Sequence, residues 1–77
     1  MTLQQLKYVI AIADSGSVNS AARNLYVSQP SLSSAVKELE EEIGFELFRR
    51  SNRGVTVRAE GEEFLNCARQ VGEQYAL

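Results

Sequence analysis

The stretch that decides the fold runs from residue 21 to residue 61 and reads AARNLYVSQPSLSSAVKELEEEIGFELFRRSNRGVTVRAEG. Near its centre, Ser28 is placed to cap a helix, and Pro30 falls in the first turn, where its missing N–H costs little. Gly44 is typical of a helix end. The sequence therefore predicts a helix over 29–43 with one buried face. The apolar positions of that face are Leu32, Val36, Leu39 and Ile43.

Two shorter helices are predicted before this central helix. Thr2 and Gln5 have the spacing of a capping box, and Asp14-Ser15-Gly16 provides an ending. Ser17 can cap a second helix, which the short connection Tyr26-Val27 separates from the central one. The apolar positions are Leu3, Leu6, Ile10 and Ala13 in the first helix, and Val18, Ala21, Ala22 and Leu25 in the second.

A hairpin and a long helix are predicted after the central helix. Residues 45–48 and 55–57 both alternate approximately between apolar and polar side chains, and the polar segment 49–54 between them contains three arginines and a glycine. The pattern then becomes helical again to the end of the chain. The expected fold is mainly α: a winged helix-turn-helix domain at 1–58, with three helices and a two-stranded β wing, followed by a long C-terminal linker helix at 59–77.

The composition limits the classes of function. The 77 residues include one cysteine and no histidine, which excludes an internal disulfide, a Cys-rich zinc site and a His-based catalytic triad. No nucleophile–base pair stands out, so we expect no enzyme, no metal and no other cofactor. The longest wholly apolar run, residues 8–13, is far shorter than a membrane span requires, and no signal segment opens the chain. These features favour a soluble cytoplasmic module.

The charges are segregated along the chain. Eight Lys and Arg against ten Asp and Glu give a net charge of -2, which is unusual for a nucleic-acid-binding protein. Residues 15–37 and 47–59 nevertheless contain no acid, because the acids gather at 38–46 and 60–73. A basic surface on an acidic protein is one interpretation, and ordinary solvated helix faces are the other. Within the 47–59 range, we expect Arg50 to pair with a carboxylate of the central helix rather than with DNA.

Two short helices joined by a tight turn and followed by a basic hairpin indicate a helix-turn-helix, whose second helix enters the DNA major groove by its N-terminal end. Ser28 and Ser31, with the free N–H groups of the first turn, suit a phosphate oxygen. A helical protein-interaction module that binds no nucleic acid is the alternative, because a helix pair alone is a weak signal. The polar positions that would meet the groove are Gln29, Pro30, Ser33, Ser34 and Lys37.

The stretch also contains a set of short motifs in unbroken order. They are Ala21-Ala22, Leu25, Val27-Ser28-Gln29-Pro30, Leu32-Ser33, Leu39-Glu40, Gly44, Leu47-Phe48, Arg50 and Gly61. With these motifs, essentially the whole chain resembles the N-terminal DNA-binding domain of LysR-type bacterial transcriptional regulators. The resemblance implies that Gln29, Pro30 and Ser33 approach base edges, and that Arg53 at the hairpin tip reaches into the minor groove. Ser34 stands where relatives commonly have arginine, which suggests a different or looser base preference.

The resemblance also implies that the last helix pairs two subunits and leads to a separate ligand-binding domain. We therefore expect a homodimer on double-stranded DNA, with a small-molecule effector acting only through a C-terminal domain that these residues do not include. The alternative is that Phe64 and Leu65 pack on the domain's own core. The two interpretations are compatible if the N-terminal half of the helix faces the core and the C-terminal half faces a partner. The positions of the expected seam, which have coiled-coil a/d spacing, are Phe64, Ala68, Val71 and Tyr75.

Overall fold

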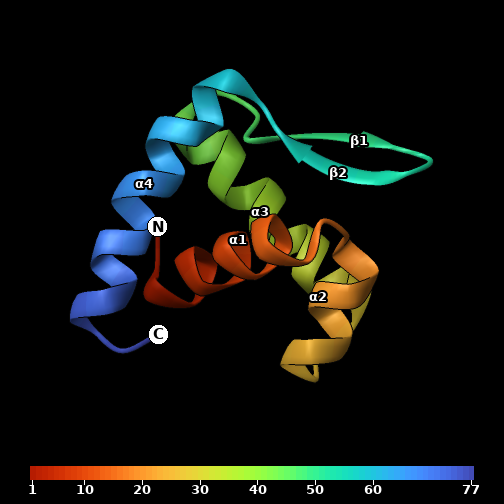
Figure 1. The fold of residues 1–77 in the computed structure, drawn as a ribbon, viewed down its shortest axis with the longest axis horizontal. Coiled ribbons are helices and arrows are strands. Elements are labelled where there is room, and N and C mark those ends of the chain that lie inside the picture. Colours follow the sequence, from red (N-terminus) through yellow and green to blue (C-terminus); the bar gives the residue numbers. More distant parts are fainter.

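The computed structural model describes all 77 residues as four helices and one antiparallel hairpin (Figure 1). The fold class is the predicted one, a mainly α winged helix-turn-helix. The first helix, α1, contacts each of the other three helices. The hairpin projects from the body of the domain. The elements are α1 (Leu3–Ser15), α2 (Val18–Leu25), α3 (Gln29–Ile43), β1 (Phe48–Ser51), β2 (Gly54–Val57) and α4 (Ala59–Gln74).

The predicted helix caps are confirmed. Thr2 and Gln5 form a complete capping box at the start of α1. Ser17 and Ser28 accept hydrogen bonds from backbone N–H groups in the first turns of α2 and α3. At the end of α2, where many helix-turn-helix units have glycine, Tyr26 itself adopts the left-handed conformation with φ of 59°, and its side chain is 96% exposed.

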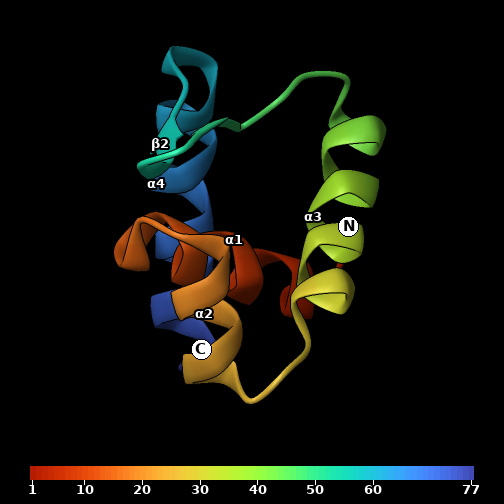
Figure 2. The same cartoon turned by 90° about the vertical axis from the view of Figure 1, so that its right-hand side faces the viewer.

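The core forms where α1, α2 and α3 meet the root of the hairpin and the first half of α4. Three side chains of α3 reach this core and are completely buried: Leu32, Val36 and Leu39. They are three of the four positions predicted for the inner face of α3, and Ile43 packs against the same core while remaining partly exposed. Figure 2 shows α3 standing apart from α4, with α1 between them.

α1 buries more of its surface than the predicted apolar positions, of which Ile10 and Ala13 pack partly against the core. Leu6 is the buried member of the predicted stripe, whereas Leu3 is 43% exposed. Tyr8, Val9 and Ile12 take the inner positions instead. The physical reason is that α1 is apolar around most of its circumference and packs against α2, α3 and α4 together. The positions of those three helices decide which side chains of α1 are covered. The spacing of apolar residues within α1 gives no information about where those helices lie.

The first strand begins three residues later than predicted, at Phe48 instead of Phe45. Leu47 is fully buried just before it. The N–H of Leu47 donates to the Glu40 carboxylate (2.7 Å), and its carbonyl accepts from the N–H of Arg58 (2.8 Å). The first bond ties Leu47 to α3, and the second extends the ladder of the hairpin by one hydrogen bond, since Leu47 and Arg58 continue its register. Residues 49 and 50 consequently lie in β1 and not in the turn.

The last helix begins at Ala59, at the predicted boundary, and its first half belongs to the same core as the other helices. Leu65 is a member of the core cluster, and Gly61 lies so close to Leu47 that an added Cβ would stand 2.6 Å from its carbonyl oxygen. Farther along, Arg69 donates to the Asp14 carboxylate of α1 (2.8 Å), and this hydrogen bond raises the pKa of its guanidinium. No helix is long and apolar enough to cross a membrane.

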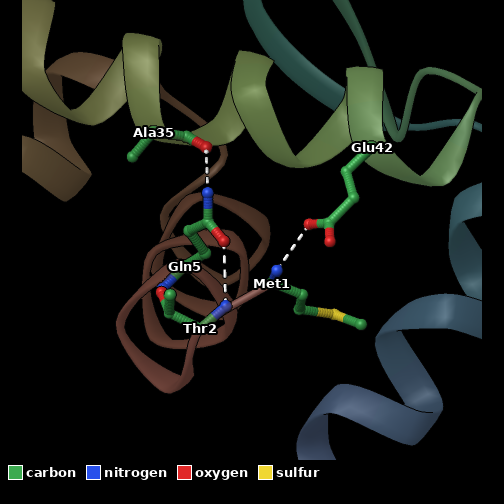
Figure 3. A network of polar contacts seen from close by, with 5 residues as sticks. All are labelled: Met1, Thr2, Gln5, Ala35 and Glu42. Carbon is green, nitrogen blue, oxygen red and sulfur yellow. Dashed lines mark hydrogen bonds and ion pairs between the residues drawn. The ribbon is translucent and has the colours of Figure 1, made fainter.

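A polar network joins the N-terminus to the outer side of α3 (Figure 3). The Met1 ammonium pairs with the Glu42 carboxylate, while the Gln5 amide donates to the carbonyl oxygen of Ala35 (3.1 Å). The N–H of Thr2 donates to the amide oxygen of Gln5 (2.9 Å), which holds the Gln5 side chain in position. Both ends of the α1–α3 contact are thus polar, around an apolar centre.

Candidate nucleic-acid interface

The start of α3 presents a polar surface without acidic groups. Gln29, Pro30 and Ser34 are exposed, and Ser33 is half-buried beside them. One turn later Lys37 is exposed in the same direction along the helix. The structure therefore brings the five polar positions selected from the sequence to one face, opposite the buried Leu32, Val36 and Leu39.

Ser28 and Ser31 close the N-terminal end of this face. The Ser28 oxygen accepts from the N–H of Ser31 (3.2 Å), and its hydroxyl donates to the Ser31 oxygen (2.8 Å). Pro30 has no N–H, so in the first turn the N–H of Gln29 is the one left without an intrahelical or capping partner. That N–H and the exposed Ser31 hydroxyl are the donors available to an anion here, fewer than the sequence suggested.

The wing carries arginine at its tip and along β1. Its register pairs Ser51 with Gly54, which leaves a turn of Asn52 and Arg53. The Ser51 oxygen accepts from the N–H of Arg53 (3.3 Å), so the turn is closed by its own side chain while the guanidinium of Arg53 is exposed. Arg49, on β1, is exposed as well.

The expected pairing of Arg50 with a carboxylate of α3 is wrong. The structure has three ion pairs, namely Met1–Glu42, Arg58–Glu60 and Arg69–Asp14. Among the carboxylates of α3, that of Glu40 accepts from the N–H of Leu47 and that of Glu42 pairs with the Met1 ammonium. Arg50 is therefore exposed and unpaired on β1, and the wing carries more free positive charge than the sequence indicated.

An open groove of about 960 Å³ separates α3 from β1. The charge of its lining changes from one end of α3 to the other. Near the start of α3 it is lined by Ser33, Ser34 and Lys37, which face the arginines of β1. Toward the end of α3 the lining becomes acidic, with Glu40, Glu41 and Glu46. Arg49 and Arg50, which the sequence pattern placed in a turn, lie on β1 and form part of this lining.

The four residues of the expected dimer seam do not share one exposed stripe. Ala68 is 3% exposed, covered by this chain's own core elements, and Phe64 packs partly against the core. Val71 is half-buried, and Tyr75 lies just beyond the end of α4 with 61% of its surface exposed. The second half of α4 and the residues after it are therefore the part of the seam that a second chain can reach.

Comparison with known proteins identifies the family. Residues 3–62 match the family described as "Bacterial regulatory helix-turn-helix protein, lysR family". The transcriptional regulator TfdT of Cupriavidus pinatubonensis is 44% identical over 71 residues, which are 92% of this chain and 31% of TfdT. ClcR of Pseudomonas putida is 42% identical over 71 residues, which are 92% of this chain and 24% of ClcR. The chain thus spans about a quarter to a third of the length of these relatives.

Solved structures agree in fold. A complex of the CbnR DNA-binding domain with DNA superposes with a TM-score of 0.93 at 41% identity, over 99% of this chain and 87% of that one. A complex of the BenM DNA-binding domain with benA site 1 DNA gives 0.93 at 34% identity, over 99% and 85%. These relatives are regulators and not enzymes, as expected for this chain. The chain therefore belongs to the lysR family of bacterial regulatory helix-turn-helix proteins and forms the DNA-binding domain of a LysR-type transcriptional regulator.

Proposed function

We propose that the chain binds double-stranded DNA with α3 in the major groove and the wing at the minor groove, as the DNA-reading part of a cytoplasmic transcription regulator. One observation carries this proposal: Ser33, Ser34 and Lys37 of α3 line one open groove together with Arg49 and Arg50 of β1, neither of which has an ion-pair partner. The CbnR and BenM domains, which share this fold, are described in complexes with DNA. A positively charged surface on a chain of net negative charge is suited to binding the phosphates of a nucleic acid.

The two walls have different tasks in this proposal. Gln29, Pro30 and Ser33 meet base edges, because the helix start is polar, small and free of acid. Ser34 has a short hydroxyl, which leaves room where a longer side chain would reach a base. Arg53 enters a narrow, A·T-rich minor groove, which attracts a guanidinium.

The remaining residues of the interface bind phosphates. Lys37 lies one turn farther along α3 than the residues proposed to meet the bases. The Ser31 hydroxyl and the N–H of Gln29 lie at the N-terminal end of α3, which is the positive end of the helix dipole. The acids of the last turns of α3 repel phosphate, so this half of the helix leans away from the duplex. No cofactor or metal takes part.

The test is binding to duplex DNA as salt is varied. The logarithm of the binding constant should fall linearly with the logarithm of salt concentration, by about 0.9 for each phosphate contacted. For about three to six contacts per chain, the slope lies between about -3 and -5. A slope near zero, or no binding at low salt, would contradict the proposal and favour a module that binds only protein.

We also propose that two copies pair through the second half of α4. Tyr75 and Leu77 are large, exposed apolar side chains at this end, beside the half-buried Val71. In this form of the seam Ala68 serves the chain's own core and Phe64 borders both. In this proposal a small-molecule effector acts through a separate ligand-binding domain, as the family resemblance implies.

Sedimentation tests the pairing. Val71→Asp would place a charge in the contact, and the cost of desolvating that charge should shift a dimer to monomer. Gln70→Asp is the matched control, because Gln70 is exposed on the neighbouring position of the same helix. Circular dichroism should show the same helix content for both variants. A monomeric unmodified chain at high concentration would contradict the proposal for this domain.

A further inference from the structure

One backbone hydrogen bond joins the wing to the turn between α1 and α2. The N–H of Val55 donates to the carbonyl oxygen of Gly16 at 2.8 Å. Val55 pairs with Arg50 across the hairpin, and because its N–H points to Gly16 it points away from β1. The outer edge of β2 is thereby tied to the helical body of the domain.

Gly54 permits this approach on two independent grounds. Its φ is +124°, a backbone conformation that residues with a Cβ rarely adopt. A Cβ built at this position would also stand 2.4 Å from the carbonyl oxygen of Gly16, which is closer than non-bonded carbon and oxygen atoms approach each other. Any other residue here must therefore push the wing away from the α1–α2 turn. Arg53, at the tip, is the residue directly before Gly54.

We propose that the contact of Gly54 and Val55 with Gly16 is a lock that sets the angle of the wing, which makes Gly54 a positioning residue for the DNA contact of Arg53. The proposal rests on the proposed DNA binding and deepens it. A two-stranded hairpin has little stability or fixed direction by itself. Phe48 anchors the root of this one and the half-buried Val55 and Val57 pack against the core along β2, so the lock adds a backbone tie at the end of β2 nearest the tip.

The lock acts on one wall of the groove and not on the other. α3 is fixed by its own buried side chains and has no contact with Gly54. Release of the lock should therefore remove what Arg53 contributes to binding while base reading by α3 persists. A general loss of fold would instead reduce both.

Amide hydrogen exchange tests the lock in the free protein. The Val55 amide should be protected in the unmodified chain and lose that protection in Gly54→Ala. Gly44→Ala is the matched control, because Gly44 also has a positive φ, +89°, but has open space where its Cβ would stand. It should lower stability while leaving Val55 protected. An unprotected Val55 amide in the unmodified chain, or a protected one in Gly54→Ala, would overturn the lock.

A double-mutant cycle tests the positioning. The probes are duplexes selected from a random library, carrying A·T-rich or G·C-rich flanks. We expect Gly54→Ala to weaken binding to the A·T-flanked duplex about fivefold, in the range of couplings between neighbouring residues, and to cost almost nothing when Arg53→Ala is already present. Val55→Pro removes the N–H and directs its ring Cδ at the Gly16 carbonyl oxygen, so it breaks the same contact without taking a bond from the hairpin and should behave in the same way.

The outcomes separate the two proposals. Equal losses from Gly54→Ala with and without Arg53 would overturn the positioning. Failure of the unmodified chain to bind any duplex would contradict the proposed function, while the exchange of Val55 would still decide whether the lock exists.

Discussion

The two walls of the groove, α3 and the wing, are held in place by different means. α3 is capped at both ends and inserts three fully buried side chains into the core. The wing consists of two four-residue strands, buries Phe48 at its root and is tied near its tip by one backbone hydrogen bond. The difference teaches that the position of α3 rests on packed side chains, whereas the wing is tied near its tip by a close approach between backbones.

The difference extends to charge. The exposed start of α3 is polar and carries little charge, while the wing carries arginines without ion-pair partners. Hydrogen bonds to base edges need fixed geometry, since they discriminate through position. Attraction between a guanidinium and a groove is less directional, so it needs the tip to be held at the groove but needs no fixed hydrogen-bond geometry. Each wall thus has the anchoring that its chemistry requires.

Removal of core side chains gives the largest expected effect. Leu32→Ala should reduce the free energy of unfolding by about 2–5 kcal/mol, because it leaves a cavity beneath α3. Val55→Ala on the wing should cost much less, because Val55 is only half-buried. Denaturant unfolding followed by circular dichroism measures both. Equal losses would show that the wing contributes to the core as much as α3 does.

The next effect concerns base reading by α3. Gln29→Ala should weaken binding to the preferred duplex by about 1–3 kcal/mol and binding to random duplex by much less. Gln29 is exposed, so the fold should be unaffected within about 0.5 kcal/mol. Competition titrations with selected and random duplexes measure the two affinities. A uniform loss on all sequences would remove base reading from Gln29.

A smaller and more uniform effect is expected from the wing tip. Arg53→Ala should weaken selected and random duplexes alike and make the salt slope less steep by about one contact. Preference for A·T-rich flanks should fade with it. Arg58→Ala is the matched control, since the charge of Arg58 is already engaged by Glu60 at 3.6 Å. If the two variants lose the same amount, position at the tip does not matter.

Much of the fold follows from signals within a few residues of each other. Thr2, Ser17 and Ser28 begin helices, and Gly16 and Gly44 end them, as capping chemistry predicts. The polar face of α3 follows from the same local spacing. Contacts between distant segments could not be predicted in this way.

Three such contacts explain the differences from the sequence-based picture. The bond between Leu47 and Glu40 fixes the segment before β1 and engages one carboxylate of the helix with which Arg50 was expected to pair. The packing of α1 between two helices selects its buried face. The bond from Val55 to Gly16 joins residues far apart in sequence through backbone atoms, for which side-chain patterns carry no signal.

The smallest expected effect tests whether ion pairing helps to hold α3. Glu42→Gln would remove the pair with the Met1 ammonium shown in Figure 3, whose side chains are 44% and 55% exposed. Exposed pairs contribute little, because water screens them and both side chains must be ordered, so stability should fall by less than about 0.5 kcal/mol. Glu41→Gln controls for the lost charge, since Glu41 is exposed on the same helix and has no ion-pair partner. Urea unfolding at low and high salt measures the difference between the two variants, which should vanish at high salt. A difference above about 1 kcal/mol that persists in salt would mean that the polar network, and not the buried side chains alone, anchors α3.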